Sequence, residues 1–190
     1  MDETIGDSGF EARWHGTRIG LVAGDITQVS VDAIVNAANS ALAGGGGVDG
    51  AIHAAAGASV MAELLRRYDG CPTGSAVITG AGDLPARWVI HAVGPIWAGG
   101  RADEAALLAS AYSASLDRAA EVGARSVAFS ALSCGIYGYP LEQAAEVALG
   151  AVRAWLSTHP GSGLEDIMWV LRGAPVMAAF RGALEALSND

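Results

Sequence analysis

The stretch Asn36-Ala37-Ala38-Asn39, followed by Gly44-Gly45-Gly46-Gly47-Val48-Asp49-Gly50, lies between an apolar strand-like segment and a helix-like one. Consecutive glycines leave their backbone N–H groups unobstructed. The start of a helix adds partial positive charge, so the combination favours phosphate oxygens. Two asparagines and an aspartate lie beside these amides. We therefore expect a nucleotide ligand that is bound through its phosphates, with polar groups nearby for chemistry on it.

Part of this run, Gly45-x-Gly47-x-x-Gly50, has the spacing of the dinucleotide-binding glycine motif. That motif directly follows a strand and is paired with an acidic residue at the end of the next strand. Here the strand-like segment ends near Asn36, so Ala37 to Gly44 intervene, and the next acid in a suitable place, Asp69, ends a helix-like segment. A dinucleotide site is therefore disfavoured, and a flexible surface turn is the simplest alternative.

Strand-like and helix-like segments alternate along the 190 residues, which predicts one α/β layer structure. We assign residues 1–16 to an N-terminal extension ending in an edge strand, and residues 17–190 to a single domain. The expected strands are Arg18 to Ala23, Ala33 to Asn36, Ala76 to Thr79, Trp88 to Val93, Ser126 to Ser130 and Ile167 to Leu171. The expected helices are Val48 to Ala56, Ser59 to Tyr68, Glu104 to Val122, Leu141 to Ser157 and Pro175 to Leu187.

The charge of the chain restricts its partners. The net charge is −9, and the eleven basic residues, all of them arginine, are scattered. A protein that grips a nucleic-acid backbone normally presents a basic face, so a general nucleic-acid binder is disfavoured. A small phosphorylated ligand can still bind an acidic protein if backbone amides and helix ends supply the positive potential.

Composition also indicates the compartment. Apolar residues make up 52% of the chain, but Gly, Pro or charged residues interrupt every run well before the ~20 residues of a membrane span. The first seven residues lack the basic end and apolar core of a signal peptide. Cys71 and Cys134 make no disulfide framework or metal cluster. We expect a monomeric protein in a reducing cytoplasm, without contact to a membrane.

Several polar residues around the glycine run are candidates for function. Asn36 and Asn39 lie at the carboxyl end of a strand, where open α/β sheets bind ligands, although turn chemistry alone explains them equally. Asp49 is either a functional carboxylate or an acid favoured in the first helical turn. His53 follows one turn later on the same face. A single helical histidine is more often a partly buried core residue than a catalyst.

A second turn-rich segment, Ser133-Cys134-Gly135-Ile136-Tyr137-Gly138-Tyr139-Pro140, follows the strand around Val127-Ala128-Phe129. Its glycines can expose further N–H groups and its tyrosines can cover a ligand, whereas the simpler interpretation is an ordinary strand–helix connection. Cys134 has no evident histidine or helix start to activate it as a nucleophile. Asp25, directly after the first strand, either caps a turn or accepts a hydrogen bond from an amino group such as that of adenine.

Together these segments resemble a macrodomain, and more narrowly the MacroD-type branch that includes bacterial O-acetyl-ADP-ribose deacetylases. The resemblance runs in order from about residue 18 to 170. It is carried by the following stretches: Gly24-Asp25-Ile26-Thr27, Val31 to Asn39, Gly44 to His53, Cys71-Pro72-Thr73-Gly74, Asp83-Leu84-Pro85-Ala86, Val89 to Pro95 and Gly135 to Pro140.

The resemblance implies a three-layer α/β/α fold with a central mixed sheet and an ADP-ribose cleft. Asp25 would bind the adenine amino group, with Ile26 contributing backbone beside it. Asn36 and His53 would lie around the distal ribose, Asn39 would orient that ribose, and Asp49 would position or deprotonate the attacking water. The diphosphate would be held by two loops, formed by Gly45, Gly46, Gly47 and Val48 and by Ser133, Cys134, Gly135, Ile136 and Tyr137.

The implied reaction is hydrolysis of an ester on the distal ribose, either an acetyl group or an Asp/Glu side chain of an ADP-ribosylated protein. It requires no metal and no cofactor. ADP-ribosylated nucleic acid presents the same ribose and stays open as a substrate. The alternative is a reader module that binds ADP-ribose without cleaving it, and a nicotinamide-dependent oxidoreductase is third. Asp49 together with Asn39 favours the hydrolase, because a reader needs no carboxylate to activate water.

Five positions depart from the family pattern. Ser130 and Cys134 stand where the family commonly has Pro and Thr, and Ala54 replaces a usual Arg. In the last strand region, Arg172 and Gly173 take the places of an aromatic residue and an acid near the adenosine. The guanidinium of Arg172 could stack on adenine instead.

Overall fold

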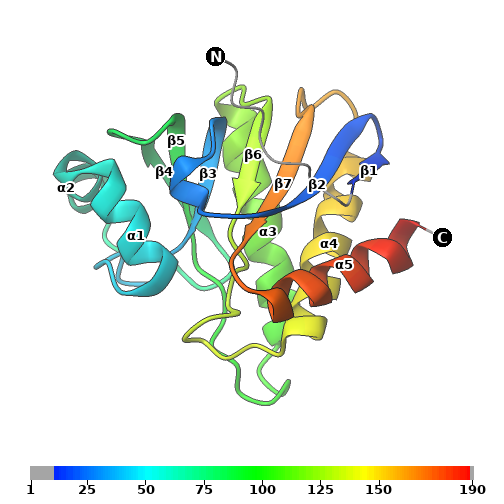
Figure 1. Ribbon diagram of the computed structural model, residues 1–190. Coiled ribbons are helices and arrows are strands. Elements are labelled where there is room, and N and C mark those ends of the chain that lie inside the picture. The colour runs from blue at the N-terminus through cyan, green and yellow to red at the C-terminus, as the bar shows by residue number, and fades with distance from the viewer. Residues whose placement is uncertain (1–10, 189–190) are drawn as a thin grey trace.

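The computed structural model describes residues 11–188 as a seven-stranded sheet between two layers of helices (Figure 1). The strand order is β1-β2-β7-β6-β3-β5-β4. The five inner strands run parallel to one another, and the edge strands β1 and β4 are antiparallel to their neighbours. The predicted α/β/α fold with a mixed sheet is confirmed.

All predicted strands and helices are present, with ends shifted by one or two residues. The strands are β1 Glu11–Trp14, β2 Thr17–Ala23, β3 Val31–Ala37, β4 Ala76–Gly80, β5 Ala86–Ala92, β6 Ser126–Phe129 and β7 Asp166–Leu171. The helices are α1 Gly47–Ala56, α2 Ala58–Arg67, α3 Glu104–Glu121, α4 Leu141–Thr158 and α5 Ala174–Ser188. A short 3-10 helix, η1 Ile26–Gln28, is an element that the sequence did not predict.

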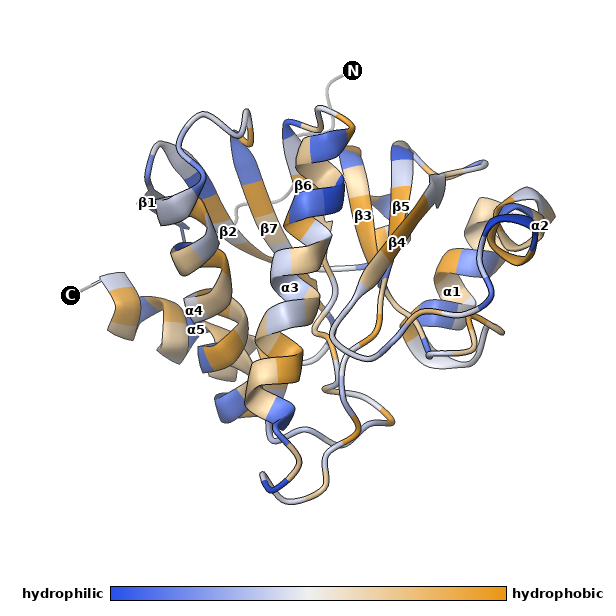
Figure 2. Ribbon diagram, turned by 180° about the vertical axis from the view of Figure 1, so that it is seen from behind, coloured by the Kyte–Doolittle hydropathy of each residue, from blue (hydrophilic) through white to orange (hydrophobic). Residues whose placement is uncertain are grey.

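Two apolar cores lie on opposite faces of the sheet. The larger packs α3, α4 and α5 against one face, where Phe129 and Trp169 stack with ring centroids 5.3 Å apart. The smaller lies under α1 and includes Ala128 and Ile52. β6 therefore contributes Phe129 to one core and Ala128 to the other, as its unbroken apolar run predicts. Figure 2 shows α3 and α4 crossing the sheet on the side of the larger core.

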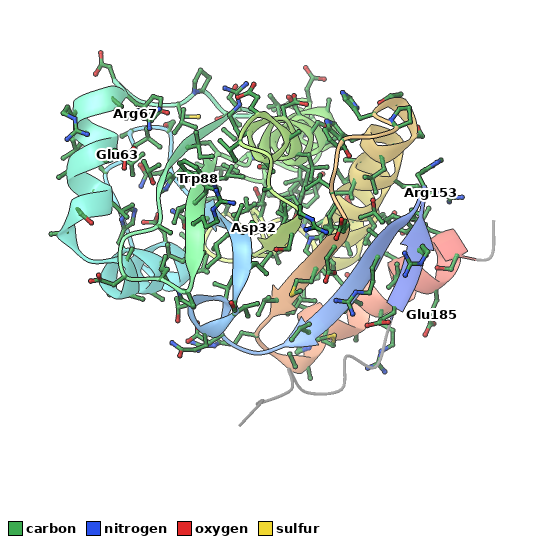
Figure 3. All side chains as sticks on the ribbon, turned by 90° about the horizontal axis from the view of Figure 1, so that it is seen from above. Asp32, Glu63, Arg67, Trp88, Arg153 and Glu185 are labelled. Carbon is green, nitrogen blue, oxygen red and sulfur yellow. The ribbon has the colours of Figure 1, made fainter. Side chains whose placement is uncertain are left out.

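The two ends of the parallel strands differ in what surrounds them. The loops that follow β5 and β6 lie together at the lower edge in Figure 1, at the carboxyl ends of the strands. At the opposite end of the sheet, where Figure 3 labels Asp32, polar contacts join neighbouring segments. Asp32 Oδ2 accepts from the N–H of Arg125 (2.8 Å) and Ser126 (3.2 Å), and Ser126 Oγ accepts from Asp32 N–H (2.8 Å), which ties β3 to β6.

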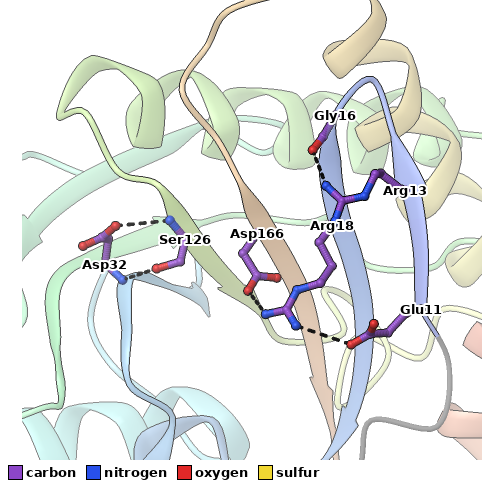
Figure 4. A network of polar contacts seen from close by, with 7 residues as sticks. All are labelled: Glu11, Arg13, Gly16, Arg18, Asp32, Ser126 and Asp166. Carbon is purple, nitrogen blue, oxygen red and sulfur yellow. Dashed lines mark hydrogen bonds and ion pairs between the residues drawn. The ribbon is translucent and has the colours of Figure 1, made fainter.

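The strand β1 closes one edge of the sheet by pairing antiparallel with β2. Figure 4 shows Arg18 of β2 between Glu11 of β1 and Asp166 of β7, so one guanidinium bridges three strands. Residues 1–10 of the predicted extension lie outside the described residues, and the division at residue 16 stays a prediction. Between residues 11 and 188 the structure contains no helix that is both long and apolar enough to span a membrane.

Candidate functional site

A cavity opens at the carboxyl end of the sheet, between the glycine run before α1 and the loop after β6. Its walls are formed mostly by small residues, with Ile136 and Tyr137 as the large side chains among them. They comprise Ala37, Ala38, Asn39, Gly45, Gly46, Gly47, Val48, Asp49, Gly94, Ala131, Ser133, Gly135, Ile136 and Tyr137. The structure thus brings together the two segments that the sequence analysis singled out, although they are far apart along the chain.

The glycine run is shaped by Asn39. Its Oδ1 accepts from Ala43 N–H (3.2 Å) and its Nδ2 donates to Gly44 O (2.8 Å), which closes the turn. Gly44 has a φ of 75°, in the left-handed region that glycine tolerates best. A Cβ on Gly50 would lie 2.6 Å from Gly45 O, so only glycine allows the loop to pack this closely on α1. Asn39 therefore stabilises this turn, and one N–H of its side-chain amide is still available to a ligand.

The start of α1 supplies the first set of amides. Gly46 is the N-cap and, within the described part of the chain, no side chain caps the helix. The N–H groups of the first helical turn, at Gly47, Val48 and Asp49, have no partner inside the helix. They lie in the cavity wall, where the helix dipole adds positive potential. This end of α1 can therefore bind an anion.

The loop after β6 supplies the second set. Ser133 has a φ of 64°, and the loop folds on itself through Gly138 N–H to Gly135 O (3.0 Å) and Tyr139 N–H to Ser133 O (3.0 Å). No described residue accepts from the N–H groups of Gly135, Ile136 or Tyr137, which line the cavity. These three amides are available to a second oxygen-rich group.

A neighbouring loop, between β5 and α3, holds this second loop in place. Trp97 N–H donates to Tyr137 O (2.9 Å), and the Trp97 and Tyr139 rings lie 4.6 Å apart. The buried carboxylate of Glu104 accepts from the N–H groups of Ala98 (2.9 Å), Gly100 (3.0 Å) and Ala102. Burial would raise the pKa of Glu104, but these bonds lower it to about 2. Sequence reasoning missed this support, because Glu104 looks like an ordinary first-turn acid.

Asp49 is the carboxylate in the cavity wall, and it is 6% exposed. Its Oδ1 accepts from Asn36 Nδ2 (2.7 Å) and lies 3.5 Å from His53 Nε2. Its Oδ2 is buried without a hydrogen-bond partner among residues 11–188. Burial opposes ionisation, but the hydrogen bonds from His53 and Asn36 outweigh it, so the pKa of Asp49 lies below its ordinary value. Asp49 is thus an anion with one buried oxygen that has no hydrogen-bond partner among residues 11–188.

Asn36 and His53 lie behind Asp49 and do not line the cavity. Asn36 is fully buried, and its Nδ2 also lies 3.2 Å from Nδ1 of His91. His91, a residue that the sequence analysis did not single out, stacks on His53 with ring centroids 5.7 Å apart. The signal for His91 was its place in the motif Val89 to Pro95, but only strand pairing brings it to Asn36. These residues support the carboxylate rather than the ligand.

Asp25 and Ile26 also lie outside the cavity lining. Asp25 caps η1, because its Oδ1 accepts from Thr27 N–H (3.0 Å) and Thr27 Oγ1 (2.8 Å). The Thr27 bonds lower the pKa of Asp25, with a smaller contribution from Arg172. Arg172, whose guanidinium could stack on adenine, here donates to Asp25 Oδ2 (2.9 Å). Ile26 is 4% exposed and packs in the smaller core.

Two departures from the family pattern, Cys134 and Ser130, make contacts inside the protein rather than in the cavity. Cys134 packs against the larger core, and burial raises its pKa to about 11, so the thiol is protonated at neutral pH. It does not line the cavity, although the resemblance implied that it would help to hold the diphosphate. Ser130 donates to Val35 O (3.1 Å) at the end of β6. The described residues contain no group of three or more His, Cys, Asp or Glu arranged to hold a metal.

Comparison with known sequences finds close relatives. A family profile described as "Macro domain" matches residues 35–148. A macro domain-containing protein of Caldanaerobacter subterraneus is 53% identical over 157 residues, which cover 81% of this chain and 88% of the relative. The O-acetyl-ADP-ribose deacetylase of Escherichia coli K12 is 55% identical over 146 residues, covering 75% of this chain and 82% of that protein.

Solved structures agree. The Oceanobacillus iheyensis macrodomain with ADP superposes with a TM-score of 0.86 at 34% identity, covering 94% of this chain and 95% of that one. The Trypanosoma brucei macrodomain in complex with ADP-ribose gives a TM-score of 0.81 at 39% identity, with 87% and 68% of the two chains covered.

Proposed function

Because the chain belongs to the macro domain family, we propose that it is a hydrolase that binds ADP-ribose and cleaves esters on its distal ribose. One observation carries the proposal. Asp49 places a buried carboxylate oxygen without a protein partner beside a cavity lined by two sets of backbone amides. Such a cavity can hold a diphosphate, and such an oxygen can act on a water molecule next to it.

Binding uses the amides rather than basic side chains. The first turn of α1 takes one phosphate and the amides of Gly135, Ile136 and Tyr137 take the other. Gly46 lines the cavity beside open space, since a Cβ built on it would meet nothing within 4 Å. Asp25 and Ile26 lie at the proposed adenine end, where Asp25 must share its Oδ2 between Arg172 and the base amino group. The ligand is thus held by an acidic protein.

Hydrolysis uses Asp49 and Asn39. The free N–H of Asn39 orients the distal ribose so that its ester faces Asp49 Oδ2, and that oxygen orients and deprotonates the attacking water. A positioned general base contributes on the order of 10²–10⁴ in rate. Orientation of the reacting groups can contribute about 7–11 kcal/mol in the best cases. An ester has a good leaving group, so these two contributions suffice without a metal or cofactor.

Two comparisons support this assignment. Relatives at 51–55% identity are named O-acetyl-ADP-ribose deacetylase. Variants of the Oceanobacillus protein that replace an asparagine, a glycine and an aspartate have been solved, and the three positions have the spacing of Asn39, Gly46 and Asp49. We propose O-acetyl-ADP-ribose and proteins carrying ADP-ribose on Asp or Glu as substrates, with ADP-ribosylated nucleic acid as a further one. We propose a monomer in the cytoplasm.

The test is release of ADP-ribose from a glutamate-linked mono-ADP-ribosylated protein, with acetate release from O-acetyl-ADP-ribose alongside. We expect the native chain to be active and Asp49→Ala to be inactive while it still binds ADP-ribose, because the amide loops are untouched. Asp69→Ala, which removes an exposed carboxylate, is the matched control. Gly46→Glu should abolish binding by placing an anion in the phosphate site.

The outcomes separate the candidate functions. A native chain that binds ADP-ribose but cleaves neither substrate would be a reader module. Equal activity of the native chain and Asp49→Ala would place the chemistry elsewhere, and binding by Gly46→Glu would show that the cleft is misplaced.

A further inference from the structure

A chain of buried polar groups behind Asp49 has no part in the mechanism proposed above. Thr79 of β4, His91 of β5 and Asn36 of β3 are each 0% exposed, on three adjacent strands of the sheet. Asn36 and His91 are paired in the register of β3 and β5. Buried polar side chains are costly unless they are hydrogen-bonded, so this row calls for a physical explanation.

The hydrogen bonds of Thr79 fix which nitrogen of His91 carries the proton. Thr79 Oγ1 donates its only hydrogen to Gly80 O (2.9 Å). With that hydrogen assigned to Gly80 O, Thr79 Oγ1 accepts from His91 Nε2, which lies 2.9 Å away. A neutral imidazole has one N–H, so Nδ1 of His91 is bare and faces Asn36.

The bare Nδ1 in turn fixes the amide of Asn36. Asn36 Nδ2 lies 3.2 Å from His91 Nδ1 and 2.7 Å from Asp49 Oδ1, so its two hydrogens are donated to these two acceptors. With the proton on Nδ1 instead, the amide would turn its oxygen toward the ring and toward the Asp49 carboxylate. That contact is repulsive, and the carboxylate would rotate away.

We propose that His91, held by Thr79, is a positioning residue that acts through Asn36 to orient the Asp49 carboxylate. With Oδ1 engaged by Asn36, Oδ2 is left to face the glycine run, where a Cβ on Gly45 would lie 3.5 Å from it. This inference rests on the proposed function, since it assigns Asp49 Oδ2 to the attacking water.

The charges around the carboxylate agree with this arrangement. Burial lowers the pKa of His91 to about 3, with a smaller contribution from His53, so the ring is neutral at neutral pH. The groups that face Asp49 are His53 from its own helix, neutral Asn36 from β3, and His91 from β5. A neutral His91 can therefore fix the direction of the carboxylate without pairing with its charge.

The experiment compares Thr79→Val, which keeps the shape and removes the hydroxyl, with Thr79→Ser, which restores it. A second pair compares His91→Leu with His91→Asn, whose side chain keeps an acceptor near the Nδ1 position. Three quantities are measured for each purified variant: kcat for ester hydrolysis, Kd for ADP-ribose, and the protonated nitrogen of the His91 ring by heteronuclear NMR in the proteins that retain it.

We expect Thr79→Val and His91→Leu to lower kcat by up to about 100-fold, the effect of misplacing a reacting group by about 1 Å. Their Kd for ADP-ribose should stay within about twofold of the native value, and Thr79→Ser and His91→Asn should recover most of the activity. NMR should place the single proton of the neutral His91 ring on Nε2 in the native chain, and should detect a mixture of the Nε2 and Nδ1 tautomers in Thr79→Val.

Three results would overturn the positioning role. They are a native ring protonated on Nδ1, an unchanged kcat in Thr79→Val and His91→Leu, and a loss of ADP-ribose binding that matches the loss of kcat, which a merely structural row would produce. If His91→Leu fails to fold, the comparison of Thr79→Val with Thr79→Ser still tests the positioning role. A native chain without ester hydrolysis refutes the proposed function first and this inference with it.

Discussion

Replacement of Gly94 by alanine is the sharpest test of how the cavity is built. Gly94 follows β5 and lies against Ser133 of the second loop. A Cβ on Gly94 would lie 2.2 Å from Ser133 Oγ, where contacts below 3.0 Å are essentially never seen, so the hydroxyl would have to retreat by about 0.8 Å. Ser133 is 5% exposed with a φ of 64°, which leaves it little freedom to retreat. Overpacking of this kind costs about 1–3 kcal/mol.

A second substitution, Ser133→Ala, removes the hydroxyl that clashes with the Cβ added at position 94. Ser133 Oγ is buried without a hydrogen-bond partner in the described chain, so its removal alone should leave stability unchanged or raise it by about 1 kcal/mol. In the double variant the added Cβ would meet Ser133 Cβ at 3.5 Å and Leu108 Cδ1 at 3.6 Å, which are ordinary contacts. We therefore expect a coupling energy of about 1–3 kcal/mol between the two substitutions.

Denaturant unfolding of the native chain, both single variants and the double variant measures this coupling, and titration with ADP-ribose follows the cavity. Gly94→Ala should bind more weakly than the native chain, and the double variant should recover. Gly150→Ala in α4, where a Cβ would meet nothing within 4 Å, is the control and should not be destabilised. A Gly94→Ala protein as stable as the native chain, or a double variant as unstable as Gly94→Ala, would refute the reasoning.

Three further predictions concern residues around the site. Glu104→Gln should lower the Tm and weaken ADP-ribose binding. Because the pKa of Glu104 is depressed from 4.5 to about 2, its contribution to stability is complete above pH 4.5 and is lost as the pH falls toward 2. Thermal melts of both proteins across this range measure the loss, and a Tm difference that does not change with pH would contradict it. Asp25→Ala should lower the free energy of unfolding by about 1 kcal/mol, because it removes the cap on η1. Arg172→Ala should lower it by less, because the ion pair between Arg172 and Asp25 is exposed, and equal decreases for the two variants would be evidence against the cap. Cys134, with its pKa raised to about 11, should resist alkylation in the folded protein at neutral pH and react faster as the pH rises; rapid labelling at neutral pH, followed by mass spectrometry, would contradict its burial.

Much of the fold follows from local patterns in the sequence. Apolar runs such as Val127-Ala128-Phe129 and the helical segment from Glu104 predicted elements whose observed ends differ by one or two residues. The element that was missed, η1, is only three residues long, and its stability depends on Asp25 bonding to Thr27, which hydrophobic periodicity does not report.

The candidate site was predicted in part. All of the predicted loop residues except Cys134 line one cavity, whereas Asn36 and His53 lie behind Asp49 and Asp25 lies outside the lining. The resemblance implied ligand contacts for these residues, whereas their local sequence context left a structural role open for each of them, and residue patterns alone do not show which side chains face the cavity. Two supporting residues were missed: Glu104 resembles an ordinary first-turn acid, and His91 reaches Asn36 only through strand pairing.

The sequence by itself determined the sheet and helix elements and the two amide-rich loops, because apolar periodicity and the placement of glycines act over a few residues. Only the tertiary structure decided which side chains meet. The parallel pairing of β3 with β5 sets His91 beside Asn36, and the packing of α1 on β3 sets Asn36 against Asp49. Strand register and helix packing depend on the whole core, so the arrangement that orients the carboxylate exists only in the folded chain.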